Sequence, residues 1–205
     1  MRLKTIGKRG AGLLLSALLA LSLCLPVSAA GGAGYTDLRG HWAESQLQWA
    51  VEQGYLTGTS ATTLSPNKTL TRGMAAVILY RYAGSPTAGE NSQFSDVPAG
   101  AYYAKAVAWA VENGITKGTS ETTFHPDETC TRAQGVTFLY RALGKLAAAQ
   151  AGFTDVAADS YYADAVNWAA ENGVTKGISE TLFGPDGSCT RAQIVTFLYR
   201  AYQGK

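Results

Sequence analysis

Residues 131–141 read TRAQGVTFLYR, and residues 190–200 repeat them as TRAQIVTFLYR with one change. The likeness extends outward, because 26 of the 34 positions in Trp109–Ala142 are identical to those in Trp168–Ala201 without a gap. A more divergent copy begins earlier, at Tyr35. Self-similarity at a fixed period indicates a protein built from stacked structural repeats.

The three copies share one order of motifs. Each opens with an aromatic residue, Ser or Thr, Asp and an aliphatic residue, continues into a Trp-Ala segment and a Gly-containing turn, and then reaches Thr-Arg and an apolar stretch. Small or polar connectors at 84–92 and 144–152 separate the copies. We therefore predict three repeats, at 35–84, 94–144 and 153–202.

The first helix of each repeat is predicted to be amphipathic. In the second repeat, residues 102–113 place apolar side chains at three- and four-residue spacing. Gly114 follows as a natural left-handed helix cap, as Gly54 and Gly173 do in the other repeats. The tryptophans of these helices are expected in the core: Trp49, Trp109 and Trp168.

The second helix of each repeat is predicted to begin at a Thr-Arg pair. Thr131 and Gln134 fit a capping box, in which each side chain bonds to the other's backbone amide, and Thr190 and Gln193 repeat it. In the first repeat Met74 replaces the glutamine. The stretch that follows is apolar on more than one side and must be buried on several sides.

The predicted fold class is mainly α. Each repeat has about 50–60 residues, which is near the lower limit for an independent hydrophobic core. We therefore expect three tandem two-helix repeats to fold as one cooperative body. Their second helices form a central pseudo-threefold bundle, and long structured loops link them to the first helices outside.

The N-terminal segment has the composition of a secretion signal. Four basic residues lie in the first nine positions, residues 13–25 form an apolar run, and Val27-Ser28-Ala29 supplies small residues for cleavage. We predict that residues 1–29 are a cleaved signal peptide. The remaining chain is then secreted, without stable membrane insertion.

Composition argues against several function classes. At 46% hydrophobic and 16% charged residues, the chain is too apolar to be disordered. Beyond the leader, 13 basic residues face 15 acidic ones, so there is no general attraction for nucleic acid. The two histidines fit no metal-ligand spacing, and no nucleophile or phosphate-loop motif is present. We expect no catalytic residues, no metal and no cofactor, and hence no enzyme.

Taken in order, these motifs resemble the S-layer homology domain. The resemblance rests on Phe-x-Asp-Val, the Trp-Ala helix, Gly-Ile-Thr-Lys-Gly, Phe-x-Pro and Thr-Arg-Ala-Gln, and it covers residues 35–202. It implies paired helices in a pseudo-trimer on a Gram-positive cell surface. It also implies noncovalent binding of secondary cell-wall polysaccharide, through a terminal pyruvylated amino sugar held in grooves between repeats.

The resemblance implies that the arginine of the Thr-Arg motif contacts the acidic glycan; this arginine is Arg72, Arg132 or Arg191. Elementary electrostatics points the same way. A cation in the first turn of a helix is disfavoured by ~0.3–1 kcal/mol, so its recurrence suggests a compensating anion. The alternative is that the arginines brace loops through salt bridges to the aspartates at the repeat starts. These are Asp37, Asp96 and Asp155.

Three further sets of residues are candidates for sugar contact, and each has a structural alternative. Loop hydroxyls that follow a glycine suit a sugar or carboxylate, but they also make ordinary turn bonds. The aspartates can bind sugar hydroxyls or cap a turn. Aromatic rings near the first helix start can stack on a sugar or pack in the core. The hydroxyl residues are Thr59, Ser60, Thr119, Ser120 and Ser179. The aromatic residues are Trp42, Tyr103 and Tyr162.

Cys130 and Cys189 occupy the repeat position that Leu70 has in the first copy. Secretion permits a disulfide between them. Their exchange for leucine nevertheless favours two free, buried thiols, because disulfide geometry is restrictive.

The function predicted is noncovalent anchoring or binding to the cell wall through secondary cell-wall polysaccharide. The alternative is a protein–protein module that binds other surface-layer proteins without direct glycan contact. That alternative is motivated by the short segment after Tyr202, residues 203–205, from which we expect no passenger domain to be anchored.

Overall fold

The computed structural model describes residues 34–89, 93–144 and 148–204. These ranges contain six helices: α1 (Glu44–Glu52), α2 (Arg72–Tyr82), α3 (Ala104–Glu112), α4 (Arg132–Ala142), α5 (Ala163–Glu171) and α6 (Arg191–Gln203). The predicted fold class, mainly α with three two-helix repeats, is confirmed. The predicted signal peptide lies outside the described residues.

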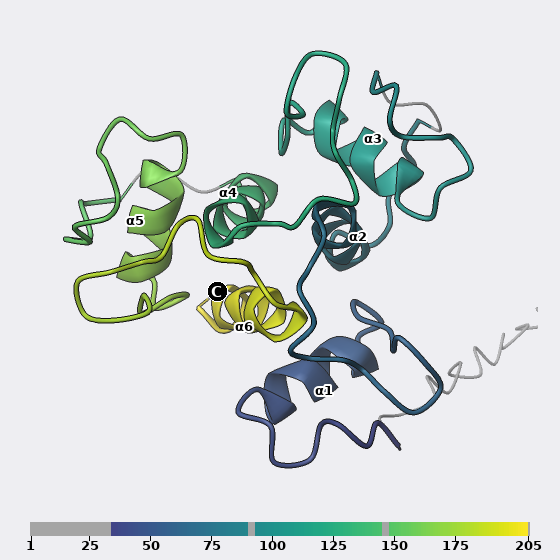
Figure 1. The fold of residues 1–205 in the computed structure, drawn as a ribbon, viewed down its shortest axis with the longest axis horizontal. Helices are drawn as coiled ribbons and strands as arrows, with labels where there is room; N and C mark the ends of the chain where they lie inside the picture. Colours follow the sequence, from purple (N-terminus) through teal and green to yellow (C-terminus); the bar gives the residue numbers. More distant parts are fainter. Residues whose placement is uncertain (1–33, 90–92, 145–147, 205) are drawn as a thin grey trace, which may run out of the picture.

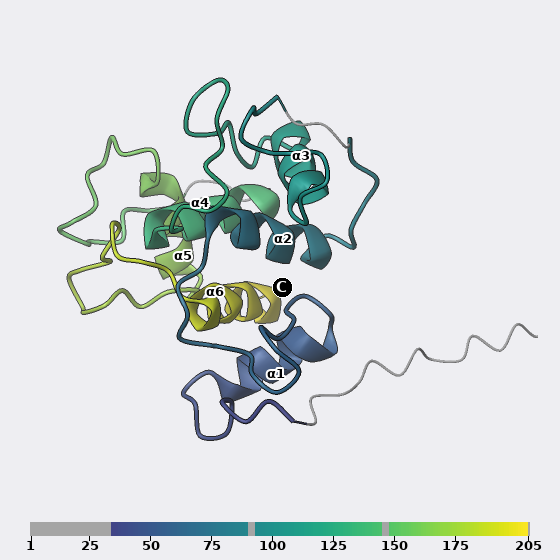
Figure 2. The same ribbon diagram turned by 45° about the vertical axis from the view of Figure 1, so that its right-hand side comes forward.

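The second helices of the repeats lie at the centre and the first helices lie outside them (Figure 1). Helix α3 packs on α2, α5 packs on α4, and α1 packs on α6. Each outer helix therefore packs on the central helix of the preceding repeat. The contact of α1 with α6 closes the ring, because it joins the first helix of the chain to the last one (Figure 2).

The central helices begin as the sequence predicts. The Thr131 hydroxyl accepts the Gln134 amide at 3.2 Å, and Gln134 Oε1 accepts the Thr131 amide at 3.1 Å. Thr190 and Gln193 form the same capping box. In α2 the Thr71 hydroxyl still accepts the amide of the third helical residue, but Met74 there cannot reach back. Local sequence therefore sets the start of all three helices.

A closed cycle of backbone bonds joins the three loops just before these helices. The Leu70 amide donates to the Cys189 carbonyl at 2.8 Å, Cys130 donates to Leu70 at 2.8 Å, and Cys189 donates to Cys130 at 2.9 Å. All three side chains are fully buried, and both thiols are free, as predicted. Burial raises the pKa of Cys130 to about 12 and raises that of Cys189 further.

The helices are short. The longest described one, α6, has 13 residues, whereas about 20 apolar residues are needed to span a bilayer. Within the described ranges, no helix combines the length and the hydrophobicity of a membrane span.

Candidate functional site

The three helix-start arginines are buried and reach across repeat boundaries. Arg72 Nε donates to the Phe124 carbonyl of repeat 2 at 2.8 Å, over 52 residues of sequence. Arg132 donates from Nε and Nη2 to the Phe183 carbonyl of repeat 3, at 3.1 and 2.9 Å. Each arginine thus fastens its own helix to the loop of the next repeat.

Arg191 completes the circle. Its Nε donates to the Leu64 carbonyl of repeat 1 at 3.0 Å, and its Nη2 donates to the Thr57 carbonyl at 2.6 Å. Burial lowers the pKa of all three guanidinium groups, because it removes the charged form from water. The predicted arginines are therefore structural links between repeats.

The repeat-start aspartates hold the other side of the same loop peptides. Asp96 accepts the amides of Phe124 and His125 at 2.9 and 2.7 Å, and Asp155 binds the Phe183 amide at 2.8 Å. Asp37 does the same in repeat 1. Partial burial raises the pKa of these carboxyls, but the backbone N–H bonds outweigh it and hold the pKa below its usual value.

These contacts support bracing as the role of the aspartates, through backbone amides within their own repeat. The alternative prediction, that the helix-start arginines form salt bridges with these aspartates, is wrong. Within the described residues, each of the arginines binds backbone carbonyls, and its guanidinium makes no ion pair with an aspartate.

The loop hydroxyls make turn bonds. Ser60 and Ser120 each accept two backbone amides of their own turn at 3.1–3.2 Å, and Ser179 accepts the Leu182 amide at 3.1 Å. Thr59 bonds to the Ser65 hydroxyl at 2.6 Å. Thr119 likewise bonds to the His125 ring, at 2.9 Å. The structural alternative accounts for these hydroxyls without a ligand.

The loop glycines serve packing rather than ligand approach. A Cβ atom on Gly118, whose φ is +85°, would lie 2.5 Å from the Phe94 ring and 2.6 Å from the Thr123 carbonyl oxygen. Gly58 and Gly177 are crowded in the same way by their own repeats. The space that glycine provides is therefore already filled by protein atoms.

The aromatic candidates need a correction. Trp42 is 61% exposed, but Tyr103 is buried and packs beside Gly73, and Tyr162 is half-buried. The exposed equivalents of Trp42 are Tyr102 and Tyr161, at 65% and 60% exposure. The signal was available in the sequence, because all three exposed residues lie seven positions before the shared tryptophan of their repeat.

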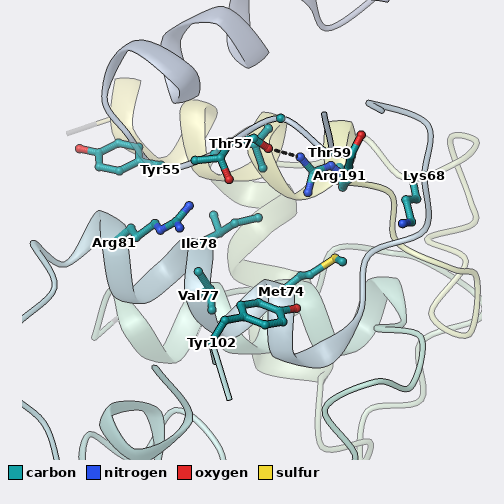
Figure 3. A pocket seen from close by; sticks show the side chains of 12 residues that line it. Tyr55, Thr57, Thr59, Lys68, Met74, Val77, Ile78, Arg81, Tyr102 and Arg191 are labelled. Atoms are coloured by element: carbon teal, nitrogen blue, oxygen red, sulfur yellow. Dashed lines mark hydrogen bonds between the residues drawn. The ribbon is translucent and has the colours of Figure 1, made fainter. Parts of the chain in front are cut away.

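Two of the grooves between the described repeats contain predicted site residues. The repeat 1 groove, of about 330 Å³, lies between the repeat 1 loop, the face of α2 and the start of α6, with Tyr102 of repeat 2 at one side (Figure 3). It contains two predicted residues, Thr59 and Arg191. All three repeats thus contribute to this one groove. Its remaining lining residues are Tyr55, Leu56, Thr57, Gly58, Lys68, Met74, Val77, Ile78 and Arg81.

The repeat 2 groove is the counterpart one repeat along, with a volume of about 370 Å³. It contains the predicted Arg72 of repeat 1 and Thr119 of repeat 2, and Tyr161 of repeat 3 forms one side. The remaining predicted site residues line neither groove. The rest of its lining is Thr116, Lys117, Gly118, Gln134, Thr137, Phe138 and Arg141.

Both grooves are cationic. Lys68, Arg81 and Arg191 line the first one; Lys117, Arg72 and Arg141 line the second, and no Asp or Glu is among the lining residues of either. Arg81 and Arg141 lie in the last turns of α2 and α4 and were not among the predicted contact residues. Arg141 does bond to the Ile115 carbonyl at 3.2 Å, yet it also lines the groove.

An anion with apolar or hydroxyl-bearing parts suits such a surface. Within the described ranges, no group of three or more His, Cys, Asp or Glu side chains is placed to hold a metal ion. The grooves also lack the pair of carboxyl groups that glycoside hydrolysis ordinarily requires. The chemistry they offer is charge-assisted binding.

Curated relatives share the repeats. A cellulosome-anchoring protein of Acetivibrio thermocellus is 30% identical over 160 residues, which cover 73% of this chain and 35% of that protein. S-layer protein EA1 of Bacillus anthracis is 32% identical over 133 residues, which cover 64% of this chain and 15% of that protein. An amylopullulanase of Thermoanaerobacterium thermosulfurigenes is 27% identical over 172 residues, which cover 80% of this chain and 9% of that protein. The chain therefore spans between 9% and 35% of the length of these relatives.

The profile of the S-layer homology domain matches three segments of the chain, one in each repeat: residues 34–76, 93–134 and 152–195. These segments include each repeat-start aspartate, each outer helix and each Thr-Arg helix start. Together with the six-helix arrangement, the match shows that the chain belongs to the S-layer homology domain family.

Proposed function

We propose that the chain is a noncovalent cell-wall-binding module that holds acidic secondary cell-wall polysaccharide in the grooves between its repeats. The ligand unit is a terminal pyruvylated amino sugar. The observation that carries this proposal is the pair of grooves, each lined by three cations and by no acidic residue.

The geometry suits such a ligand. A pyruvate ketal carries one carboxylate, for which arginine and lysine supply charge-assisted hydrogen bonds. Tyr102 and Tyr161 stand exposed beside the cations and can stack on a sugar ring. Two grooves on one polymer-rich surface raise avidity without a tight individual site.

The relatives support anchoring over catalysis. Their names include surface-layer and cellulosome-anchoring proteins, and the match to the amylopullulanase covers only 9% of that enzyme. A shared repeat module with different remaining sequence fits a common attachment role. The predicted signal at residues 1–29 agrees with a location at the cell surface.

The test is co-sedimentation of the chain from residue 30 onward with protein-free cell-wall sacculi, before and after acid extraction of the secondary polymer. Binding is expected before extraction and lost after it. The informative variant is Lys68→Ala with Lys117→Ala, since both lysines are exposed groove residues. It should weaken binding about tenfold or more, because each groove loses a charged contact.

The matched control is Arg39→Ala, which removes an exposed cation outside both grooves. Equal binding by all variants, or binding that survives extraction, would contradict the proposal. Replacing the three helix-start arginines is not a clean test, because their removal breaks contacts between repeats.

One observation favours the protein–protein alternative. On the repeat 3 loop, Ile178 and Leu182 are 63% and 39% exposed, where the other loops have threonines. Exposed apolar side chains suit a protein partner more than a sugar acid. Binding to whole surface-layer preparations but not to protein-free sacculi would establish this alternative.

A further inference from the structure

Two buried polar atoms of the described residues have no hydrogen-bond partner, and both belong to side chains that line the repeat 2 groove. They are Nη2 of Arg72 and Oγ1 of Thr137. Their side chains are 3% and 2% exposed. A buried polar group without a partner destabilises the free protein, so such groups are rare unless something else binds them.

The Arg72 guanidinium is held in a single orientation. Nε is engaged with the Phe124 carbonyl at 2.8 Å, while the guanidinium carbon lies 4.7 Å from the Phe124 ring centre and 5.4 Å from that of Phe138. Held between two rings, the group cannot turn to find another acceptor. Its unpaired N–H therefore stays at the wall of the groove.

The equivalent arginines have no such spare donor. Nη2 of Arg191 donates to the Thr57 carbonyl at 2.6 Å, and Nη2 of Arg132 donates to the Phe183 carbonyl at 2.9 Å. The pseudo-threefold repeat thus places three similar arginines at similar positions. Only Arg72 of the three keeps Nη2 without a protein acceptor.

The equivalents of Thr137 differ in the same way. Thr196 satisfies its hydroxyl by donating to the Ala192 carbonyl at 2.8 Å. In repeat 1 the position is Val77, which has no hydroxyl and faces the repeat 1 groove beside Met74. The repeat 2 groove is therefore polar where the repeat 1 groove is apolar.

We propose that the two grooves are not equivalent, and that the repeat 2 groove is the principal carboxylate site of the chain. There a ligand carboxylate accepts from Arg72 Nη2 and Thr137 Oγ1, and Thr137 sets the preference for this groove. The proposal rests on the proposed function and specifies it further. Lys117 and Arg141, which are exposed, draw the anion to the groove. Both unpaired atoms are closed to solvent in the free protein, so a ligand reaches them only when a side chain of the groove lining moves.

The test is calorimetric titration of the chain from residue 30 onward with the methyl glycoside of a pyruvylated amino sugar, and with the same glycoside lacking the ketal. Thr137→Val keeps the shape and removes the hydroxyl. It should weaken binding of the pyruvylated glycoside by about threefold to tenfold, the effect of one hydrogen bond. It should also raise the melting temperature by about 2–4 °C, because an unsatisfied buried hydroxyl is removed.

The matched control is Thr196→Val, which removes a satisfied hydroxyl at the equivalent position. It should leave binding unchanged and should not raise the melting temperature. In the converse variant, Val77→Thr, the affinity of the repeat 1 groove should rise toward that of the repeat 2 groove, so that the titration shows two similar sites.

The outcomes separate the two claims. A wild-type chain that binds neither the glycoside nor extracted polymer overturns the proposed function together with this inference. A wild-type chain that binds the pyruvylated glycoside while Thr137→Val binds it equally well overturns the inference alone. Equal losses of affinity for the pyruvylated glycoside in Thr137→Val and Thr196→Val would also overturn the inference, because both effects would then be structural.

Discussion

Arg72 binds one residue in two ways: its Nε donates to the carbonyl oxygen of Phe124 at 2.8 Å, and its guanidinium lies 4.7 Å over the ring of the same residue. Arg132 and Phe183 repeat the arrangement. Asp96 holds the amide of the Phe124 residue. The loop peptide is thus gripped by its own repeat on one side and by the preceding repeat on the other.

Arg132→Ala should destabilise the fold by about 2–4 kcal/mol, because it leaves the buried Phe183 carbonyl unpaired and opens a cavity. Urea denaturation followed by circular dichroism measures the change. Arg141→Ala, at the exposed end of the same helix, is the control and should cost about 1 kcal/mol or less. Similar losses for both variants would mean that the contact between repeats contributes little.

Acid should weaken the loops. Since N–H donors hold the folded-state pKa of Asp37, Asp96 and Asp155 below its ordinary value of 3.8, these carboxylates stabilise the fold above that pH. The contribution is lost as pH falls through the folded values. Melting temperatures should change little from these groups between pH 7 and 5 and fall below pH 4.

Asp96→Asn provides the comparison for this pH dependence. The side-chain NH₂ of the asparagine would point at a backbone N–H, and two donors cannot form a hydrogen bond. The variant should therefore be less stable at pH 7 and should lose less stability in acid. A variant that follows the wild-type curve with a constant offset would show that Asp96 does not contribute to the acid transition.

The exposed and buried tyrosines should separate binding from folding. Tyr102→Ala should lower affinity for wall polymer by about threefold to tenfold, through loss of a ring contact, with little change in stability. Tyr103→Ala should instead cost about 3–5 kcal/mol, because it empties a buried position. Sacculus co-sedimentation and thermal melts measure the two effects. Reversed results would restore Tyr103 as the contact residue.

Removing one repeat should abolish both grooves. A chain of residues 30–144 lacks Arg191, which lines the repeat 1 groove, and Tyr161, which lines the repeat 2 groove. It also lacks α6, the helix on which α1 packs. Such a chain should lose cooperative unfolding and wall binding. A permuted chain, in which residues 93–204 precede 34–89 through a flexible linker, keeps every contact between repeats and should retain both. Wall binding by the truncated chain would contradict this account of the grooves.

Helix positions were predictable because their causes are local. Thr131 and Gln134 are three residues apart, and the capping box that they form depends on those residues alone. The same holds for its loss at Met74. Trp42 was predicted, but the exposed rings of Tyr102 and Tyr161 were missed, because adjacent aromatic residues differ in burial only after the outer helix has packed.

The sequence by itself determined the three repeats, the two helices of each, the free thiols and the family, since repetition, periodicity and capping are properties of short segments. Only the tertiary structure decided where the helix-start arginines point. Their acceptors lie 51 to 134 residues away in the next repeat, so the contact exists only once the ring has closed. The grooves follow from the same closure, because each takes side chains from all three repeats.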